Sequence, residues 1–371
     1  MEKLKGLMCH PTVCAVNDNY QIMIPVEYDM LISVRVGENI YYNHSNGIRI
    51  SSQRVQRISV PAIELDKHKK YTVICQKMIE RKPYRPVTEP EYELEYNFKP
   101  IEKTEDINIY HLADVHGEED GAVGSAQFLN KEIDLLIMNG DLAEYSDSIE
   151  DVTIAYRMAS RITKGEVPCI ISRGNHDLRG VYAERLADFM PNDNGNSYFT
   201  FKVGCIWGIL VDTGEDKVDE NIEYGNTICC HQFRLEQEKF INKVIENAKD
   251  HYEKDDIKYR FVISHVPFSF RMESPFDIEK DMYARWGSVI KENIKPDLML
   301  CGHIHKPLVS YIGSEHDELG QPCTVISGSD NKWINETTKL HTGMYMNLNP
   351  GVAKIIFNTK DKIVGEDLVE F

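Results

Sequence analysis

The chain has no long apolar run. Its 371 residues contain no stretch that approaches the roughly 18 consecutive apolar residues needed to cross a bilayer. Residues 1–17 include Lys3 and Lys5 but lack the apolar core of a secretory signal, so we expect no signal peptide in this stretch. These absences predict a cytoplasmic protein without a membrane partner.

Basic residues are in short supply. Lys and Arg total 42 against 59 Asp and Glu, which gives a formal net charge of −17. Proteins that bind nucleic acids in general need a basic face to neutralise phosphates, so this balance excludes such a protein. It does not exclude a small phosphorylated molecule, because a bound metal ion can dominate the charge of a pocket.

The cysteines lack the spacing of a disulfide framework. There are nine, an odd number, spread from Cys9 to Cys323, which favours buried thiols in a reducing compartment. The cluster Cys229-Cys230-His231 invites a metal-site interpretation, but adjacent residues of an extended strand point to opposite sides. We therefore expect a structural role for this cluster, or a place in a substrate loop.

Residues 12–98 carry short β-rich runs at regular spacing and almost no helical periodicity. The runs cover residues 21–26, 30–36, 39–42, 55–60, 71–78 and 92–98. Short strands separated by regular turn signals are typical of a β-sandwich. We predict an all-β sandwich of immunoglobulin or fibronectin-III type over residues 1–103.

After this region the sequence alternates between strand-like, loop-like and helical segments. Apolar runs typical of buried strands cover residues 107–113, 134–138, 167–172, 260–263 and 297–301. Helical periodicity covers residues 148–164 and 231–248, and strand-like runs return at 308–312, 323–327, 344–348 and 354–357. We predict an α/β domain over residues 104–371, in which a second sheet packs on the first.

Polar residues that could bind metal follow each of the five buried runs. They are two carboxylates, one amide and four imidazoles: Asp114, Asp141, Asn175, His116, His265, His303 and His305. Functional loops of α/β sheets gather at the carboxyl ends of strands, so these side chains can converge. Oxygen and imidazole donors without thiolate suit Mn, Fe or Zn, and their number suits two ions. Two ions a few ångström apart form the clamp used to hydrolyse phosphate esters.

The ordered motifs resemble those of the calcineurin-like metallophosphoesterases. They are Asp114-x-His116, Gly140-Asp141-x-x-Glu144, Gly174-Asn175-His176-Asp177, His265 and Gly302-His303-x-His305. The match spans residues 105–310. The resemblance implies a layered αββα core, and a sandwich preceding such a core is similar to the arrangement of plant-type purple acid phosphatases.

The resemblance also implies how the ligands are shared between two ions. The first ion would take Asp114, His116 and His305, and the second would take Asn175, His265 and His303. Asp141 would bridge both ions. The nucleophile would be a metal-bound hydroxide, because coordination lowers the pKa of water towards about 7.

Three further residues of the motifs are candidates for supporting roles in catalysis. As an imidazolium, His176 could donate a proton to the leaving oxygen of the substrate or stabilise charge on the phosphoryl oxygens. The resemblance to protein phosphatases makes Glu144 the candidate that orients His176, and Asp177 is a further supporting candidate.

Two departures from the family pattern narrow the function. Glu144 stands where purple acid phosphatases carry a tyrosine ligand, and Tyr145 comes one position late, so we predict a colourless enzyme. Tyr145 also stands where the protein phosphatases carry a phosphate-binding arginine. Arg173 and Arg179 flank the asparagine motif and are the candidate replacements, because arginine suits bidentate binding of phosphate.

Two other segments are candidates for shaping the substrate pocket. Residues 212–231 have no regular pattern and contain Tyr224 and His231, as a binding loop or lid would. Residues 267–285 contain aromatic side chains that could stack on a nucleobase, although packing in the core is their commoner fate. The segment contains Phe268, Phe270, Arg271 and Met272, with Trp286 just beyond.

The sequence as a whole predicts a phosphatase that acts on a small phosphorylated substrate. A phosphodiesterase of the same superfamily is the alternative within enzymes, and a nuclease is disfavoured by the net charge of −17. From another class, a non-catalytic metal-binding scaffold remains the rival. The oligomeric state is left open.

Overall fold

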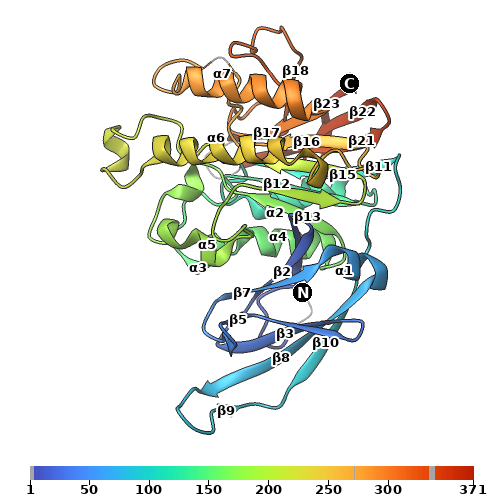
Figure 1. Cartoon of the computed structure of the whole chain (residues 1–371), viewed down its shortest axis with the longest axis vertical. Helices are drawn as coiled ribbons and strands as arrows, with labels where there is room; N and C mark the ends of the chain where they lie inside the picture. Colours follow the sequence, from blue (N-terminus) through green and yellow to red (C-terminus); the bar gives the residue numbers. More distant parts are fainter. Residues whose placement is uncertain (1–3, 271, 334–338) are drawn as a thin grey trace.

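The computed structural model describes residues 4–270, 272–333 and 339–371, and Figure 1 shows their arrangement in layers of sheet and helix. The largest sheet has ten strands in the order β23-β22-β21-β11-β12-β13-β1-β2-β7, with β20 paired to β21. Their bounds are β1 (Thr12–Val16), β2 (Asn19–Pro25), β7 (Val55–Pro61), β11 (Ile107–Leu112), β12 (Leu135–Asn139), β13 (Pro168–Ser172), β20 (Asp330–Trp333), β21 (Lys339–Asn349), β22 (Val352–Asn358) and β23 (Ile363–Glu370). β11, β12 and β13 run parallel at its centre.

The second sheet has six strands in the order β14-β15-β16-β17-β19-β18. Their bounds are β14 (Phe199–Val203), β15 (Ile206–Leu210), β16 (Tyr259–Ile263), β17 (Leu298–Cys301), β18 (Leu308–Ser310) and β19 (Thr324–Ser327). Every residue of β15 and β17 is buried, as are those of β12 and β13 in the first sheet. Parallel strands covered on both faces need such continuous apolar runs, which explains why the sequence pattern located them.

The third sheet consists of N-terminal strands in the order β10-β8-β3-β4, with β9 paired to β8. Their bounds are β3 (Met30–Val36), β4 (Asn39–Tyr42), β8 (Lys70–Glu80), β9 (Val87–Thr88) and β10 (Tyr92–Asn97), and a small hairpin adds β5 (His44–Ser45) and β6 (Ile48–Arg49). In Figure 1 these strands lie at the end of the molecule opposite α7 (Lys280–Val289).

Apart from α1 (Ala62–His68), which packs against strands of the first and third sheets, the helices cover the outer faces of the two large sheets. Besides α1 and α7, the α-helices are α2 (Glu119–Phe128), α3 (Ile149–Val152), α4 (Ile154–Thr163), α5 (Leu186–Phe189) and α6 (Cys230–Glu246). One apolar cluster joins α2 and α4 to the first sheet, and another joins α6 and α7 to the second. A third cluster lies between the inner faces of the two sheets. These three clusters define a helix–sheet–sheet–helix sandwich, and the predicted layering is confirmed.

The N-terminal region is nearly all strand, as predicted, but it does not keep its strands to itself. β1 pairs in parallel with β13, so β1, β2 and β7 extend the largest sheet. A self-contained sandwich would hold both of its sheets within residues 1–103, and this expectation is not confirmed. The boundary at residue 103 stays a prediction, and sheet hydrogen bonds cross it.

The two predicted helices are present with altered bounds. The pattern over residues 148–164 forms α3 and α4, which separate at Thr153, whose hydroxyl donates to the Ile149 carbonyl at 2.6 Å. Ser148 caps α3 in a capping box with Asp151. The pattern over residues 231–248 forms α6. None of the helices among the described residues combines the length and apolar character needed to cross a membrane.

One helix that the sequence did not predict, α2, contains Gly121 and Gly124. Glycine weakens helices by about 1 kcal/mol relative to alanine, which hides the pattern. The structure explains both residues by close packing. A Cβ on Gly124 would lie 2.8 Å from the Cβ of Lys360, and one on Gly121 would lie 3.3 Å from the Cβ of His341.

Candidate metal centre

The five ligand segments meet where the carboxyl ends of strands from both large sheets come together. Segments after β11, β12 and β13 come from the first sheet, and segments after β16 and β17 come from the second. The segments contribute Asp114, His116, Asp141, Asn175, His265, His303 and His305. The second sheet therefore supplies histidines, and the first supplies both carboxylates.

The backbone at this meeting point is unusual. Five of the seven predicted ligands have left-handed φ angles: Asp114 (49°), His116 (47°), Asp141 (50°), His303 (70°) and His305 (49°). A residue with a Cβ avoids this region at a cost of about 1–2 kcal/mol, and such conformations cluster at functional sites. The chain therefore retains strain at the positions that point the ligands inward.

Glycines let the ligand loops approach one another. A Cβ on Gly140 would lie 2.6 Å from the backbone nitrogen of Gly174, and a Cβ on Gly302 would lie 2.7 Å from an oxygen of Asp114. The glycines of the three motifs are thus required by close packing of one loop against the next.

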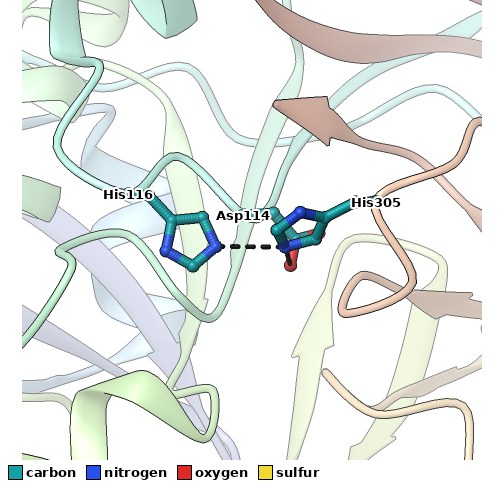
Figure 2. Close-up of side chains that lie close together, drawn as sticks. All are labelled: Asp114, His116 and His305. Atoms are coloured by element: carbon teal, nitrogen blue, oxygen red, sulfur yellow. Dashed lines mark hydrogen bonds and ion pairs between the residues drawn. The ribbon is translucent and has the colours of Figure 1, made fainter. Parts of the chain in front are cut away.

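The first predicted ligand set is assembled around Asp114, His116 and His305, which Figure 2 shows pointing towards one another. His305 Nε2 lies 3.4 Å from Asp114 Oδ1 and 3.1 Å from His116 Nε2. Ligand atoms bound to one ion at about 2.1 Å and at right angles lie about 3.0 Å apart. These separations are close to that spacing.

The second set adjoins the first through Asp141. His265 Nε2 lies 3.1 Å from Asp141 Oδ2, and His303 Nδ1 lies 3.0 Å from Asn175 Oδ1. Asp141 Oδ2 is also 4.0 Å from His116 Nε2. Asp141 therefore lies between the two sets, at the position that the resemblance assigned to the bridging ligand.

The electrostatics of these groups fit a bound cation. Burial alone would raise the pKa of Asp141, but the charge of His265 lowers it to about 2. Burial alone would lower the pKa of His265, but the carboxylates of Asp141 and Asp114 raise it to about 10. Without metal, a protonated His265 supplies the positive charge that two buried carboxylates require. Burial lowers the pKa of His303 to about 4, which keeps it neutral as a ligand must be.

Groups behind the ligands hold them in place. His265 Nδ1 lies 2.7 Å from the Asn139 carbonyl, so its Nε2 faces the carboxylates. The Asp177 carboxylate accepts from the backbone amides of Asp141 (3.0 Å) and Gly174 (2.7 Å), which places Asp177 in support of two ligand loops. The amide of His303 donates to both oxygens of Asp114 at 2.9 Å.

His176 stands beside the first ligand set. Its ring meets the His116 ring edge-on at 4.7 Å between centroids, and its Nδ1 lies 3.2 Å from the Glu144 carbonyl oxygen. The Glu144 carboxylate is 3.2 Å from His116 Nδ1 but 3.9 Å from His176 Nδ1. The main chain of Glu144 is thus the nearer partner of His176, and its side chain is the nearer partner of a predicted ligand.

The two candidate phosphate-binding arginines have different partners, and only one of them contacts His176. Arg179 Nη1 lies 3.3 Å from His176 Nε2, while Arg179 Nε and Nη2 each donate to the Glu215 carboxylate at 2.8 Å. Arg173 instead donates to the Asp212 carboxylate, and its guanidinium lies over the Phe233 ring at 5.3 Å. Only Arg179 is brought against the predicted catalytic histidine.

A cleft of about 930 Å³ is lined by both arginines and by Tyr145, and it adjoins His176 through the contacts that Arg179 and Tyr145 make with that ring. Tyr224, Cys229 and Cys230 line it too, so the irregular loop over residues 212–231 does form part of its wall. His231 is not part of that lining, and its Nδ1 lies 2.7 Å from a Glu279 oxygen.

The other candidate segment lines a much smaller cavity of about 20 Å³ beside His303. Phe268 and Phe270 contribute to it but are only 2% and 4% exposed, and Trp286 is fully buried. Core packing is thus the main role of these aromatics. Arg271 lies outside the described residues.

Several residues at the centre were not identified from the sequence. Ser329 donates to Asp114 Oδ2, and an oxygen of Asp216 lies 3.8 Å from His303 Nε2. Asn139, whose carbonyl holds His265, was also missed. Its signal in the sequence was a polar residue at the end of the apolar run of β12, directly before Gly140. Ser329 and Asp216 carry no such signal, because neither follows a predicted strand within a recognised motif.

Residues 107–307 match the family model described as calcineurin-like phosphoesterase. This segment is more than half of the chain, and the protein belongs to the calcineurin-like phosphoesterase family. The structure is similar to that of a purple acid phosphatase from yellow lupin (Lupinus luteus) seeds, with a TM-score of 0.56 and 11% identity over 98% of this chain and 74% of that one. It is also similar to PhoD, with a TM-score of 0.52 and 10% identity over 98% and 88% of the two chains. At such identities the likeness shows the fold. No curated protein matches this sequence significantly.

Proposed function

We propose that this protein is a phosphoester hydrolase whose centre holds two metal ions and acts as a phosphatase. The observation that carries the proposal is the placement of Asp141 between two sets of ligand atoms, each within 4.8 Å of one another. Mn, Fe and Zn are the ions that suit this donor set. When bound, the two ions would supply the Lewis acidity that activates a water molecule and neutralises phosphate charge.

The protein's own residues would position the substrate and manage one proton. Asp141 and Asp114 would concentrate negative charge where the ions bind, and Ser329 and the His303 amide hold Asp114 in place. His176 Nδ1 donates to the Glu144 carbonyl, and its Nε2 lies 3.3 Å from Arg179 Nη1. With substrate bound, Arg179 Nη1 would donate to a phosphoryl oxygen instead of to Nε2, which leaves Nε2 able to carry a proton. As the bond from phosphorus to the leaving oxygen breaks, Nε2 would transfer that proton to the leaving oxygen.

Arg179 would complete the site in place of the arginine that protein phosphatases carry at the position where this chain has Tyr145. Its Nη1 adjoins His176 Nε2, and the fork to Glu215 fixes its plane. The nearer phosphoryl oxygen would then accept from Nη1. The Tyr145 ring stacks on His176 at 6.1 Å, so we propose that it is not a metal ligand and that the iron-loaded protein is colourless.

The test is hydrolysis of an aryl phosphate monoester and of the matching diester by the full chain loaded with Mn. We expect His176→Ala to lower turnover by about 10²–10⁴-fold, the usual contribution of a general acid, with the fold retained. Asp141→Asn should lose both turnover and at least one of two bound ions. Asp361→Asn, at an exposed turn, is the matched control and should behave as wild type.

The outcomes separate the proposal from its alternatives. Preference for the diester would make the protein a phosphodiesterase. Full activity in both His176→Ala and Asp141→Asn would refute the proposed site. A chain that binds no Mn or Zn would instead favour the non-catalytic scaffold.

A further inference from the structure

Beyond the metal centre, the cleft beside His176 restricts what the substrate can be. It adjoins the site through Tyr145 and Arg179, both of which line it. Its volume of about 930 Å³ is at the upper end of the roughly 300–1,000 Å³ of pockets that bury small ligands. The cavity beside His303 measures about 20 Å³, little more than one water molecule occupies. The cleft is therefore where the organic part of a phosphoester has room.

The wall of the cleft is apolar and aromatic next to His176. Tyr145 is 44% exposed, and its ring is inclined by only 21° to the His176 ring. Leu178, Ile228 and Phe233 extend this apolar surface. A flat group bonded to the phosphate could therefore lie against Tyr145 while its ester oxygen faced His176. Aromatic pairs contribute about 0.5–1.5 kcal/mol beyond the burial of their area.

The positive charges on the wall are already compensated. Arg179 is held by Glu215, which is 1% exposed, through two hydrogen bonds of 2.8 Å. Arg173 is held by a single hydrogen bond from its Nε to the carboxylate of Asp212, which is 4% exposed. Both carboxylates are fixed behind the guanidinium groups, so they remain paired whether or not a ligand is bound.

Further negative charge lies on the wall itself. Glu184 and Glu223 line the cleft together with Glu215, against the two arginines as the only basic residues of the described lining. Glu223 is paired with Lys217, which lies outside that lining, so Glu184 carries the uncompensated charge of the wall. A leaving group that carries its own negative charge would meet more carboxylates than guanidinium groups. Like-charge contacts of this kind discriminate against the wrong partner.

We propose that this cleft is the leaving-group site and that it selects phosphoesters whose leaving group is a flat, apolar group without negative charge. The inference rests on the proposed function, since it assigns a substrate class to the same centre. The inferred selectivity excludes three classes of preferred substrate, all of which carry further negative charge: phosphorylated sugar acids, nucleotides with further phosphates, and phosphopeptides rich in acidic residues.

The test compares two esters of the same shape, 4-carbamoylphenyl phosphate and 4-carboxyphenyl phosphate. They differ in one negative charge at the far end of the ring. The metal-loaded full chain is used, with the matching methyl diesters if diesters are preferred. We expect kcat/KM to favour the carbamoyl ester by about tenfold. Comparing this ratio between wild type and variants cancels the intrinsic difference in reactivity between the two esters.

Charge variants test the electrostatic part. Glu215→Gln should release Arg179 and reduce the preference about tenfold. Glu184→Gln, at an exposed position, should reduce it about two- to threefold and keeps the test valid if Glu215→Gln does not fold. Glu38→Gln, in the exposed turn between β3 and β4, is the control and should leave the ratio unchanged.

An aromatic variant tests the stacking part. Tyr145→Ala should raise KM for both aryl esters about two- to tenfold while the charge preference persists. Tyr84→Ala, which removes a ring that is 87% exposed and absent from the cleft lining, should change neither constant.

The outcomes distinguish this inference from the proposed function. A preference for the carbamoyl ester that weakens in Glu215→Gln or Glu184→Gln supports the inference. Hydrolysis of both esters at equal kcat/KM, or a preference for the carboxylate, would overturn the inference and leave the proposed function intact. No hydrolysis of either ester or of their methyl diesters would overturn both.

Discussion

Asn139 joins the two large sheets directly beneath the metal centre. Its side chain is fully buried at the end of β12. Its Oδ1 accepts from the Ser172 hydroxyl at 2.7 Å, which binds it to the neighbouring strand β13. Its Nδ2 lies 3.2 Å from His111 Nε2 in β11 and donates to the Leu300 carbonyl of the second sheet at 3.0 Å. One amide thus connects three strands of one sheet with a strand of the other.

Replacing Asn139 with alanine should therefore destabilise the chain strongly. Two buried groups would be left without this partner, the Ser172 hydroxyl and His111 Nε2, while the Leu300 carbonyl would lose one donor and keep the Ser264 amide. A buried polar group without a partner costs about 1–3 kcal/mol, so we expect a total of about 4 kcal/mol. Typical unfolding free energies are about 5–15 kcal/mol, and the variant should lose a large part of this reserve.

The measurement is urea unfolding of wild type and Asn139→Ala with metal removed by a chelator. The midpoint should fall while the dependence on urea stays the same, since the surface exposed on unfolding is unchanged. Ser172→Ala is the matched control, because it removes one of the three bonds and should cost about 1–2 kcal/mol. A second readout is Mn affinity, which should stay close to that of wild type, because the group that fixes His265 is the backbone carbonyl of residue 139, which alanine retains.

One result would refute this reasoning. If Asn139→Ala unfolded within about 0.5 kcal/mol of wild type, the usual range for surface substitutions, the amide would not hold the sheets together.

Two further predictions concern stability. His305 has a φ of 49°, so in metal-free protein His305→Gly should be more stable than His305→Ala by about 1 kcal/mol, measured by urea unfolding, and equal stability would argue against backbone strain there. Burial lowers the pKa of His111 to about 3 and that of His341 to about 4, against about 6.5 when unfolded, so both favour the folded state fully above pH 6.5 and progressively less below it. Each should cost about 2 kcal/mol by pH 5, and His341→Leu should make the acid decline correspondingly shallower in urea titrations from pH 7.5 to 5, whereas an unchanged decline would show that His341 is not buried and neutral.

The sequence predicted those parts of the fold whose pattern is local. The buried strands before the five motifs were recognisable because a strand covered on both faces is apolar throughout. The ligand loops followed from their position after those strands. In contrast, α2 was hidden by Gly121 and Gly124, whose reason is packing against residues more than 200 positions away.

Pairings between distant segments were not encoded in any local pattern. Nothing in β1 indicates that its partner is β13, so the N-terminal strands were expected to close on themselves. The charge state of the cleft was hidden in the same way. Arg173 and Arg179 were identified by their motif, but Asp212 and Glu215, which neutralise them, belong to a loop without periodicity.

The pairing of β1 with β13 has a consequence for how the chain folds as it is made. Val13 lies opposite Pro168, so after β1 has been made 155 further residues must follow before its partner strand begins. At about 5–20 residues per second, this delay is roughly 8–30 s. Throughout that time one edge of β1 is unpaired and apolar, a state prone to association with other chains. Slower synthesis or loss of chaperones should thus lower the yield of folded protein while leaving the stability of the chains that have folded unchanged.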